Sequence, residues 1–198
     1  MGVRGAHDGW ARLLVADVLL PDGSRATREI EDHGEAVGVL PYDPARRVAL
    51  LVRQFRAPVR HVLGETSGEA DDLIEVPAGL RDEPDAEAAA RREVLEEVGL
   101  RLGDLEPVCT AWSMPGISTE RMALYLAPYG AADRVAAGGG LAAERESITV
   151  VELPLAELAR RADAGALTDL KTLALVQTLR LRRPDLFSPD LFRSRDPR

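Results

Sequence analysis

Cysteine is nearly absent from this chain of 198 residues, and Cys109 is its one example. No internal disulfide can form, which excludes a small secreted scaffold held together by disulfides. We expect Cys109 to act as a small buried hydrophobic residue on a strand. Long apolar runs are also missing: none approaches the ~20 residues of a membrane span, and residues 1–10 contain no apolar segment typical of a secretory signal. We therefore expect a soluble cytoplasmic protein.

Basic residues are outnumbered by acidic ones. The chain has 25 Lys and Arg against 33 Asp and Glu, a formal net charge of −8. This balance argues against general nucleic-acid binding, for which a basic face is expected. Lys171 is the only lysine, which we attribute to composition and not to chemistry. A hydrophobic fraction of 45% is sufficient for the core of one domain with a small accessory piece.

Three acids, Glu93, Glu96 and Glu97, form the most informative cluster in the chain. Their i, i+3 and i+4 spacing places them on one side of a helix, where like charges repel each other. A divalent cation would turn this repulsion into binding energy. Ligands made only of oxygen suit hard ions such as Mg²⁺ or Ca²⁺ rather than Zn²⁺, and no cysteine pair or histidine cluster lies nearby.

A simpler interpretation is an amphipathic helix whose acidic face is only solvated, which is the usual meaning of such a charge patch. Against it, Val94, Leu95 and Val98 fall on the opposite side, so the helix has a face for the core. The Pro-Ala-Gly turn at residues 77–79 and the acidic loop at 81–85 also form an elaborate approach to a plain surface helix. We therefore predict a magnesium-binding helix.

The stretch R-E-V-L-E-E-V-G-L at residues 92–100 resembles the second half of the Nudix box, R-E-U-x-E-E-x-G-U with U apolar, at every defined position. The resemblance implies a hydrolase that cleaves a diphosphate linkage with Mg²⁺, or with Mn²⁺ in its place. It also implies a set of metal ligands, one of them a backbone carbonyl. These are Ala78, Glu93, Glu96, Glu97 and Glu146.

The first half of the box, G-x5-E-x7, is not matched, because Gly79 lies one residue too close to Arg92. Either Pro84 or Asp85 then stands where the first glutamate belongs. In the family this acid braces the helix through the arginine and is not a main metal ligand. An acid at 82 or 83 is near enough to substitute.

A glycine-rich segment, residues 136–147, precedes the predicted strand at 148–153. It lacks the spacing of a phosphate-binding loop, so we interpret it as a mobile lid. Its end, E-R-E-S-I-T-V, is similar to the family's E-x-E-D-I-E-V, with Ser147 in place of the acid. The resemblance implies that Glu144 is the catalytic base and Glu146 a further ligand, and it leaves the division of roles between the two open.

The segment V-R-Q-F-R at residues 52–56 places two arginines beside an aromatic ring. Arg53 and Arg56 could bind phosphate through their paired donors, and Phe55 could stack on a base. The alternative is an ordinary strand edge with exposed charges. The segment resembles the one that precedes the box in pyrophosphatases of ADP-ribose and nucleoside diphosphate sugars, which favours contact with the substrate.

The turn at residues 113–121, S-M-P-G-I-S-T-E-R, resembles the S-P-G-x-x-[ST]-E-[KR] segment of the same branch, with Met114 as an insertion. Glu120 is therefore a candidate for contact with the substrate or with the shell around the metal. The alternative is a solvent-exposed salt bridge between Glu120 and Arg121.

The fold class that the resemblance implies is α/β, an α/β/α Nudix sandwich with a mixed sheet at residues 34–182. Residues 1–33 contain a β-hairpin signal with its turn at 21–24, and we expect them to form a small separate sheet. The resemblance implies that this sheet mediates a homodimer, whereas the hairpin itself shows only that its apolar face needs a partner, which could equally be its own Nudix domain. Residues 183–198 would be a tail. The expected strands and helices follow the local patterns. We expect strands at 12–20, 25–31, 35–42, 46–55, 73–76, 105–112, 122–127 and 148–153, a surface loop at 61–72, and helices at 154–164 and 167–181.

The implied function is hydrolysis of a nucleoside diphosphate sugar to a nucleoside monophosphate and a sugar phosphate. ADP-ribose is the favoured substrate, because the elements around the box resemble ADP-ribose pyrophosphatases. GDP-mannose is the alternative, since the glycine-rich loop and the turn at 113–121 resemble GDP-mannose hydrolases. A third hypothesis is a Nudix-like module that binds a nucleotide without cleaving it, although such a module has no need of all the glutamates.

Overall fold

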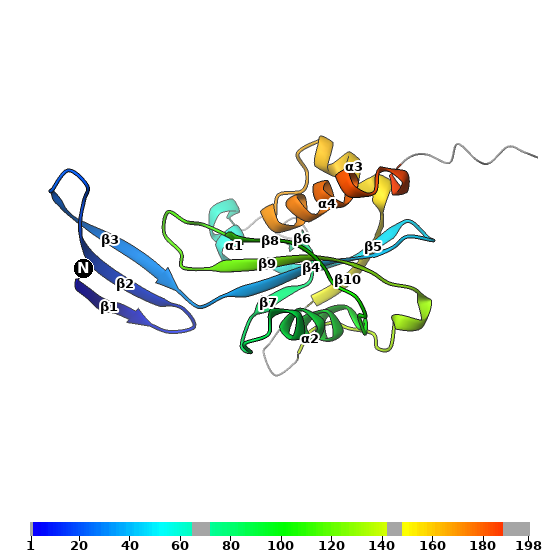
Figure 1. Ribbon diagram of the computed structural model, residues 1–198, viewed down its shortest axis with the longest axis horizontal. Coiled ribbons are helices and arrows are strands. Elements are labelled where there is room, and N and C mark those ends of the chain that lie inside the picture. Colours follow the sequence, from blue (N-terminus) through cyan, green and yellow to red (C-terminus); the bar gives the residue numbers. More distant parts are fainter. Residues whose placement is uncertain (1, 65–71, 142–147, 188–198) are drawn as a thin grey trace, which may run out of the picture.

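A mixed seven-stranded sheet lies between two layers of helix in the computed structural model (Figure 1). The structure describes residues 2–64, 72–141 and 148–187. The main path of the sheet is β10-β5-β4-β9-β8, with β6 beside β5 and β7 beside β4. Among the strand pairs of this sheet that the structure describes, only β4·β9 is parallel. The strands are β4 (Ala36–Asp43), β5 (Val48–Phe55), β6 (Asp72–Glu75), β7 (Ala78–Leu80), β8 (Glu106–Trp112), β9 (Arg121–Pro128) and β10 (Ile148–Pro154).

The helices cover both faces of this sheet. Helix α2 (Ala86–Val98) lies on one face, and α3 (Leu155–Asp163) and α4 (Leu170–Arg182) lie on the other (Figure 1). Helix α1 (Ala57–Leu63) directly follows β5, and short 3-10 turns occupy Ala131–Asp133 and Pro184–Leu186. This arrangement confirms the α/β/α sandwich that the sequence predicts.

The core has two parts because side chains of a strand alternate between its faces. In β5, Leu50 and Val52 pack toward α2, whereas Ala49 and Leu51 pack toward α3 and α4. Both faces are apolar, as expected for a central strand that is covered on both sides. The apolar run that the sequence assigns to a buried strand is therefore the centre of the sheet.

A separate antiparallel sheet precedes the sandwich and projects away from it (Figure 1). It contains β1 (Gly2–Asp8), β2 (Arg12–Leu19) and β3 (Arg25–Asp32) in that order. The predicted hairpin is β2 and β3, and β1 adds a third strand to it. Nothing in the sequence of β1 signals a strand, because it shows no apolar alternation, and in the structure all seven of its residues are exposed.

Several local predictions were wrong. Cys109 lies on β8 as expected, but its side chain is exposed. Leu95 is 38% exposed, so only Val94 and Val98 of the predicted apolar face are buried. Helix α1 occupies the start of the expected loop, and Leu186 of the expected tail packs into the core.

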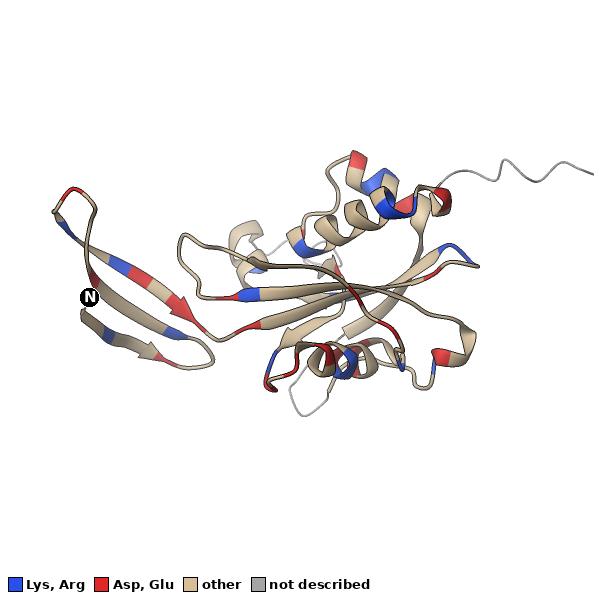
Figure 2. Cartoon of the chain, in the orientation of Figure 1, with Lys and Arg blue, Asp and Glu red and all other residues tan. Residues whose placement is uncertain are grey.

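Charged residues of both signs are interspersed on α2 and on the loop before it (Figure 2). Within the described residues, no helix combines the length and the apolarity needed to cross a membrane.

Candidate active site

The box helix α2 has a clear start and a clear end. Asp85 caps its N-terminus by accepting a hydrogen bond from the Glu87 amide at 3.0 Å. Gly99 ends it in the left-handed conformation at φ 72°. Between these caps the helical period places Glu93 and Glu97 one turn apart on the same face.

Glu93 and Glu97 both contact the start of strand β7, directly after the turn that follows β6. A Cβ on Gly79 would lie 2.2 Å from the Glu93 carboxyl carbon, so Glu93 packs directly on the glycine backbone. Glu97 is only 3% exposed, and its Oε2 accepts a hydrogen bond from the Ala78 amide at 3.0 Å. A merely solvated acidic face does not describe Glu97, which points to the interior.

Arg92 ties the preceding loop to the helix. Its guanidinium contacts Glu93 at 2.8 Å, Glu96 at 3.3 Å and both carboxylate oxygens of Glu83 at 3.4 Å. Burial lowers the pKa of Arg92, but the hydrogen bond to Glu83 and the surrounding carboxylates outweigh it and raise the pKa. Glu83 therefore occupies the bracing position, while Asp85 serves as the cap.

The oxygen donors around Ala78 fit a hard cation. Glu93 and Glu97 supply carboxylate oxygens at Ala78 and Gly79, and oxygen is the ligand atom that such a cation prefers. Within residues 2–64, 72–141 and 148–187, no three His, Cys, Asp or Glu side chains are already gathered as a metal site. Arg92 draws Glu96 and Glu93 toward itself. The predicted Glu146 lies outside the described residues, as does Glu144.

The first part of the glycine-rich segment is anchored to the end of α2. The amides of Gly139 and Gly140 donate to the carbonyls of Glu97 at 2.9 Å and Glu96 at 3.1 Å. A Cβ on Gly138, which has φ 76°, would lie 2.5 Å from the Glu97 carbonyl oxygen. For residues 136–141 the predicted lid is thus wrong. These glycines satisfy carbonyls that every helix leaves unpaired at its end, a need that could have suggested the contact.

A cavity of ≈ 700 Å³ is lined by Ala78 and Gly79, the residues that Glu97 and Glu93 contact, although the three glutamates of the acidic cluster are not among its described lining residues. Its walls combine the turn between β1 and β2 and the linker after β3 with β7, β8, the turn before β9 and the start of α4. Arg56 and Glu120, both predicted substrate contacts, line it together with Ala78. Arg53 and Phe55 are not among the described lining residues, and Phe55 is 54% exposed. Two of the four residues predicted to contact the substrate therefore line the cavity.

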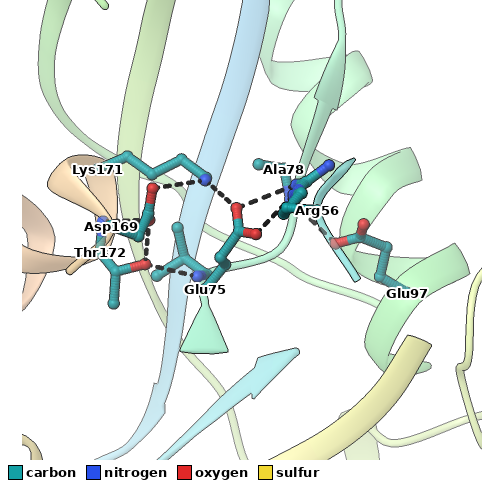
Figure 3. A network of polar contacts seen from close by, with 8 residues as sticks. Arg56, Glu75, Ala78, Glu97, Asp169, Lys171 and Thr172 are labelled. Carbon is teal, nitrogen blue, oxygen red and sulfur yellow. Dashed lines mark hydrogen bonds and ion pairs between the residues drawn. The ribbon is translucent and has the colours of Figure 1, made fainter. Parts of the chain in front are cut away.

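A buried ion-pair network forms one wall of this cavity (Figure 3). Glu75, 2% exposed, accepts two hydrogen bonds from Arg56, at 2.7 and 3.0 Å, and pairs with Lys171. Lys171 also contacts Asp169 at 2.9 Å, and Asp169 caps α4 through the Thr172 amide. Burial raises the pKa of Glu75, but the Arg56 hydrogen bonds and the Lys171 charge outweigh it and lower the pKa.

The single lysine therefore has a structural and electrostatic role, which sequence analysis missed. Its partner Glu75 is 96 residues away in the chain, so no local pattern connects them. The one available signal was the rarity of lysine, which we attributed to composition.

The contacts of Glu120 differ from those of the alternative interpretation, which is a solvent-exposed salt bridge with Arg121. Its Oε1 lies 3.1 Å from Nε2 of His33. Arg121 instead lies 5.6 Å from the centre of the Trp112 ring and 3.9 Å from Glu35. The expected pairing of Glu120 with Arg121 is replaced by a contact that connects the linker after β3 to the cavity.

Comparison with known proteins agrees with this geometry. The profile of the NUDIX domain matches residues 32–174. The chain is 37% identical over 173 residues to a GDP-mannose pyrophosphatase of Cronobacter sakazakii, covering 86% of this chain and 87% of that protein. It is 38% identical over 153 residues to a GDP-mannose pyrophosphatase of Pectobacterium atrosepticum, covering 77% and 76%.

A solved structure shares the fold. The crystal structure of an ADP compounds hydrolase superposes with a TM-score of 0.72 at 19% identity and covers 93% of both chains. The fold and the acidic helix define a hydrolase of the pyrophosphatase type. The chain belongs to the Nudix family.

Proposed function

We propose that this protein hydrolyses the diphosphate linkage of a nucleoside diphosphate sugar, with Mg²⁺ or Mn²⁺, to a nucleoside monophosphate and a sugar phosphate. One observation carries the proposal: the start of β7, which Glu93 and Glu97 contact, also forms part of the wall of the ≈ 700 Å³ cavity. Cations at the acidic cluster and a nucleotide sugar in the cavity would then share a boundary.

We propose GDP-mannose as the first substrate to test. The curated relatives at 34–38% identity are GDP-mannose pyrophosphatases, and they are covered over about three quarters or more of their length. ADP-ribose, which the sequence alone favoured, stays in the comparison as the second candidate. Purine bases differ at their edges, so the discrimination depends on hydrogen bonds at the base.

Each residue of the site has a proposed task. Mg²⁺ bound by Glu93, Glu97 and the Ala78 carbonyl, with Glu96 and Glu146, would neutralise the diphosphate oxygens. Arg56, oriented by Glu75, would bind a phosphate, and Glu120 would accept a hydrogen bond from the substrate. Glu144 would take the proton of the attacking water. Arg53 and Phe55 would act at the margin of the site, outside the described cavity wall.

We also propose a cytoplasmic homodimer formed through the N-terminal sheet. This sheet, which we treat as a subdomain separate from residues 34–182, projects from the sandwich (Figure 1). Ala16 is the one buried residue of its three strands, so a partner surface would supply the apolar contact that this sheet lacks. Light scattering should give twice the chain mass of 21.4 kDa, and a mass that stays at 21.4 kDa across concentrations would contradict the dimer.

The test of the reaction is a substrate panel. GDP-mannose, ADP-ribose, other nucleotide sugars and diadenosine polyphosphates are incubated with Mg²⁺, and the released monophosphate is measured. We expect turnover of a nucleotide sugar that EDTA abolishes and added Mg²⁺ restores. Tight binding of one compound with no turnover of any would instead identify a nucleotide-binding module.

A further inference from the structure

His33 lies between two carboxylates at the joint between the N-terminal sheet and the sandwich. Its Nδ1 contacts Glu31 on β3, and its Nε2 lies 3.1 Å from Oε1 of Glu120. The His33 side chain is 12% exposed. The Trp10 ring stacks on the imidazole with a centroid distance of 4.8 Å and an interplanar angle of 26°.

The same residues form a closed hydrogen-bonded ring. Ser118 Oγ donates to Oε2 of Glu31 at 2.6 Å and accepts from the Glu120 amide at 3.1 Å. Glu120 is thus held at its side chain by His33 and at its backbone by Ser118. Both connections lead to Glu31, so the end of β3 determines where the Glu120 carboxylate sits.

The geometry favours an imidazolium. A neutral imidazole has one N–H and one bare nitrogen, whereas here both ring nitrogens face carboxylate oxygens. Burial lowers the pKa of His33, but the hydrogen bonds to Glu31 and Glu120 and the charges of both outweigh it and raise the pKa. Asp32, which also interacts with the charge of His33, is already paired with Arg12.

We propose that His33 is a positioning residue, which in its protonated form holds the Glu120 carboxylate in place to accept a hydrogen bond from the bound nucleotide sugar. Trp10, His33 and Glu120 all line the cavity. Deprotonation removes one of the two donors of the ring, and the longer contact, to Glu120, is the one that opens. This inference rests on the proposed function, because it takes Glu120 to touch the substrate.

The test compares KM and kcat of wild type and His33→Gln between pH 6 and 9. In wild type, KM should rise about tenfold as the pH passes upward through the pKa of His33, because one charged hydrogen bond is lost. In His33→Gln, KM should stay high throughout with kcat within about twofold of wild type. His7→Gln on β1, an exposed histidine, is the matched control and should behave as wild type.

Glu31→Gln gives a second readout that a merely structural role would not produce. It removes one of the two carboxylates, so the pH at which KM rises should move downward. An unchanged KM profile in both variants overturns the inference, and so does an equal loss in kcat and thermal stability without a shift of the profile. Absence of turnover in wild type would instead contradict the proposed function, which separates the two failures.

Discussion

Glu97→Gln is expected to lower kcat/KM on the order of 10³-fold while the protein stays folded. Glutamine keeps the size of the side chain, and its amide oxygen can still accept the Ala78 hydrogen bond that Glu97 accepts at 3.0 Å. It lacks the negative charge that holds a divalent cation. Metal stabilisation of the transition state is worth several kcal/mol, and each ~1.4 kcal/mol changes the rate tenfold. The measurements are the rate of monophosphate release as a function of Mg²⁺ concentration and the thermal melting curve.

Glu87→Gln is the matched control for this prediction. Glu87 lies on the same helix, and its side chain is 47% exposed and paired with Arg91 at 3.1 Å. Such a pair contributes only ~0.5 kcal/mol or less, so activity should be unchanged. Full activity of Glu97→Gln would remove Glu97 from the set of metal ligands.

Gly79→Ala tests the same site through the residue of β7 on which Glu93 packs. The added methyl would displace the flexible Glu93 carboxylate, whose three atoms are the nearest to its position, at 2.2 to 2.4 Å. Activity should therefore fall while the fold persists. Gly103→Ala, whose added methyl has nothing within 4 Å, is the matched control and should be neutral. Equal activity in the two variants would show that Glu93 need not hold this position.

Glu75→Leu is expected to lower the free energy of unfolding by about 3 kcal/mol, the lower end of the range for breaking a buried ion pair. Glu75 is 2% exposed and neutralises Arg56 and Lys171 together. The loss is moderated because the Arg56 side chain is 39% exposed and Lys171 keeps Asp169. Urea denaturation of the variant and of wild type measures the difference.

The control for Glu75 is a glutamate of the same sheet in a surface pair. Glu152→Leu breaks the contact with Arg46, whose side chain is 54% exposed, and should cost no more than ~1 kcal/mol. Equal losses for the two variants would show that burial of the Glu75 network does not matter.

Lowering the pH should weaken the same Glu75 network and so reduce the stability of the folded protein. The pKa of Glu75 is lowered in the folded state, so its contribution is complete above the ordinary glutamate value of about 4.3 and is lost as the pH falls through the lower folded pKa. Glu75→Leu should accordingly lose less stability than wild type between neutral pH and pH 3.

The helices and strands that could be predicted are those whose sequence signals lie within the element itself. Helix α2 carries its period, its cap and its terminal glycine within residues 85–99, and the apolar runs of β4 and β5 indicate strands that are buried on both faces. Strand β1 and helix α1 have no buried residue, so neither shows the apolar periodicity on which such predictions depend.

The site was only partly predictable because several of its contacts join distant segments. Glu93 and Glu97 of the box contact the start of β7, but Glu75 and Lys171 are 96 residues apart, and His33 and Glu120 are 87 apart. Each of these residues has an unremarkable local setting. Their chemistry arises only when the sheet brings the start of α4, the linker after β3 and the turn before β9 to one cavity.

The contact between Glu83 and Arg92 has a consequence for how members of this family are found. The loop before the helix is one residue shorter than the box prescribes, yet an acid still reaches the arginine. In this chain the reach of the Glu83 side chain compensates for the missing residue of the loop. A search pattern with fixed spacing would discard this chain, whereas a criterion based on an arginine-braced loop would retain it.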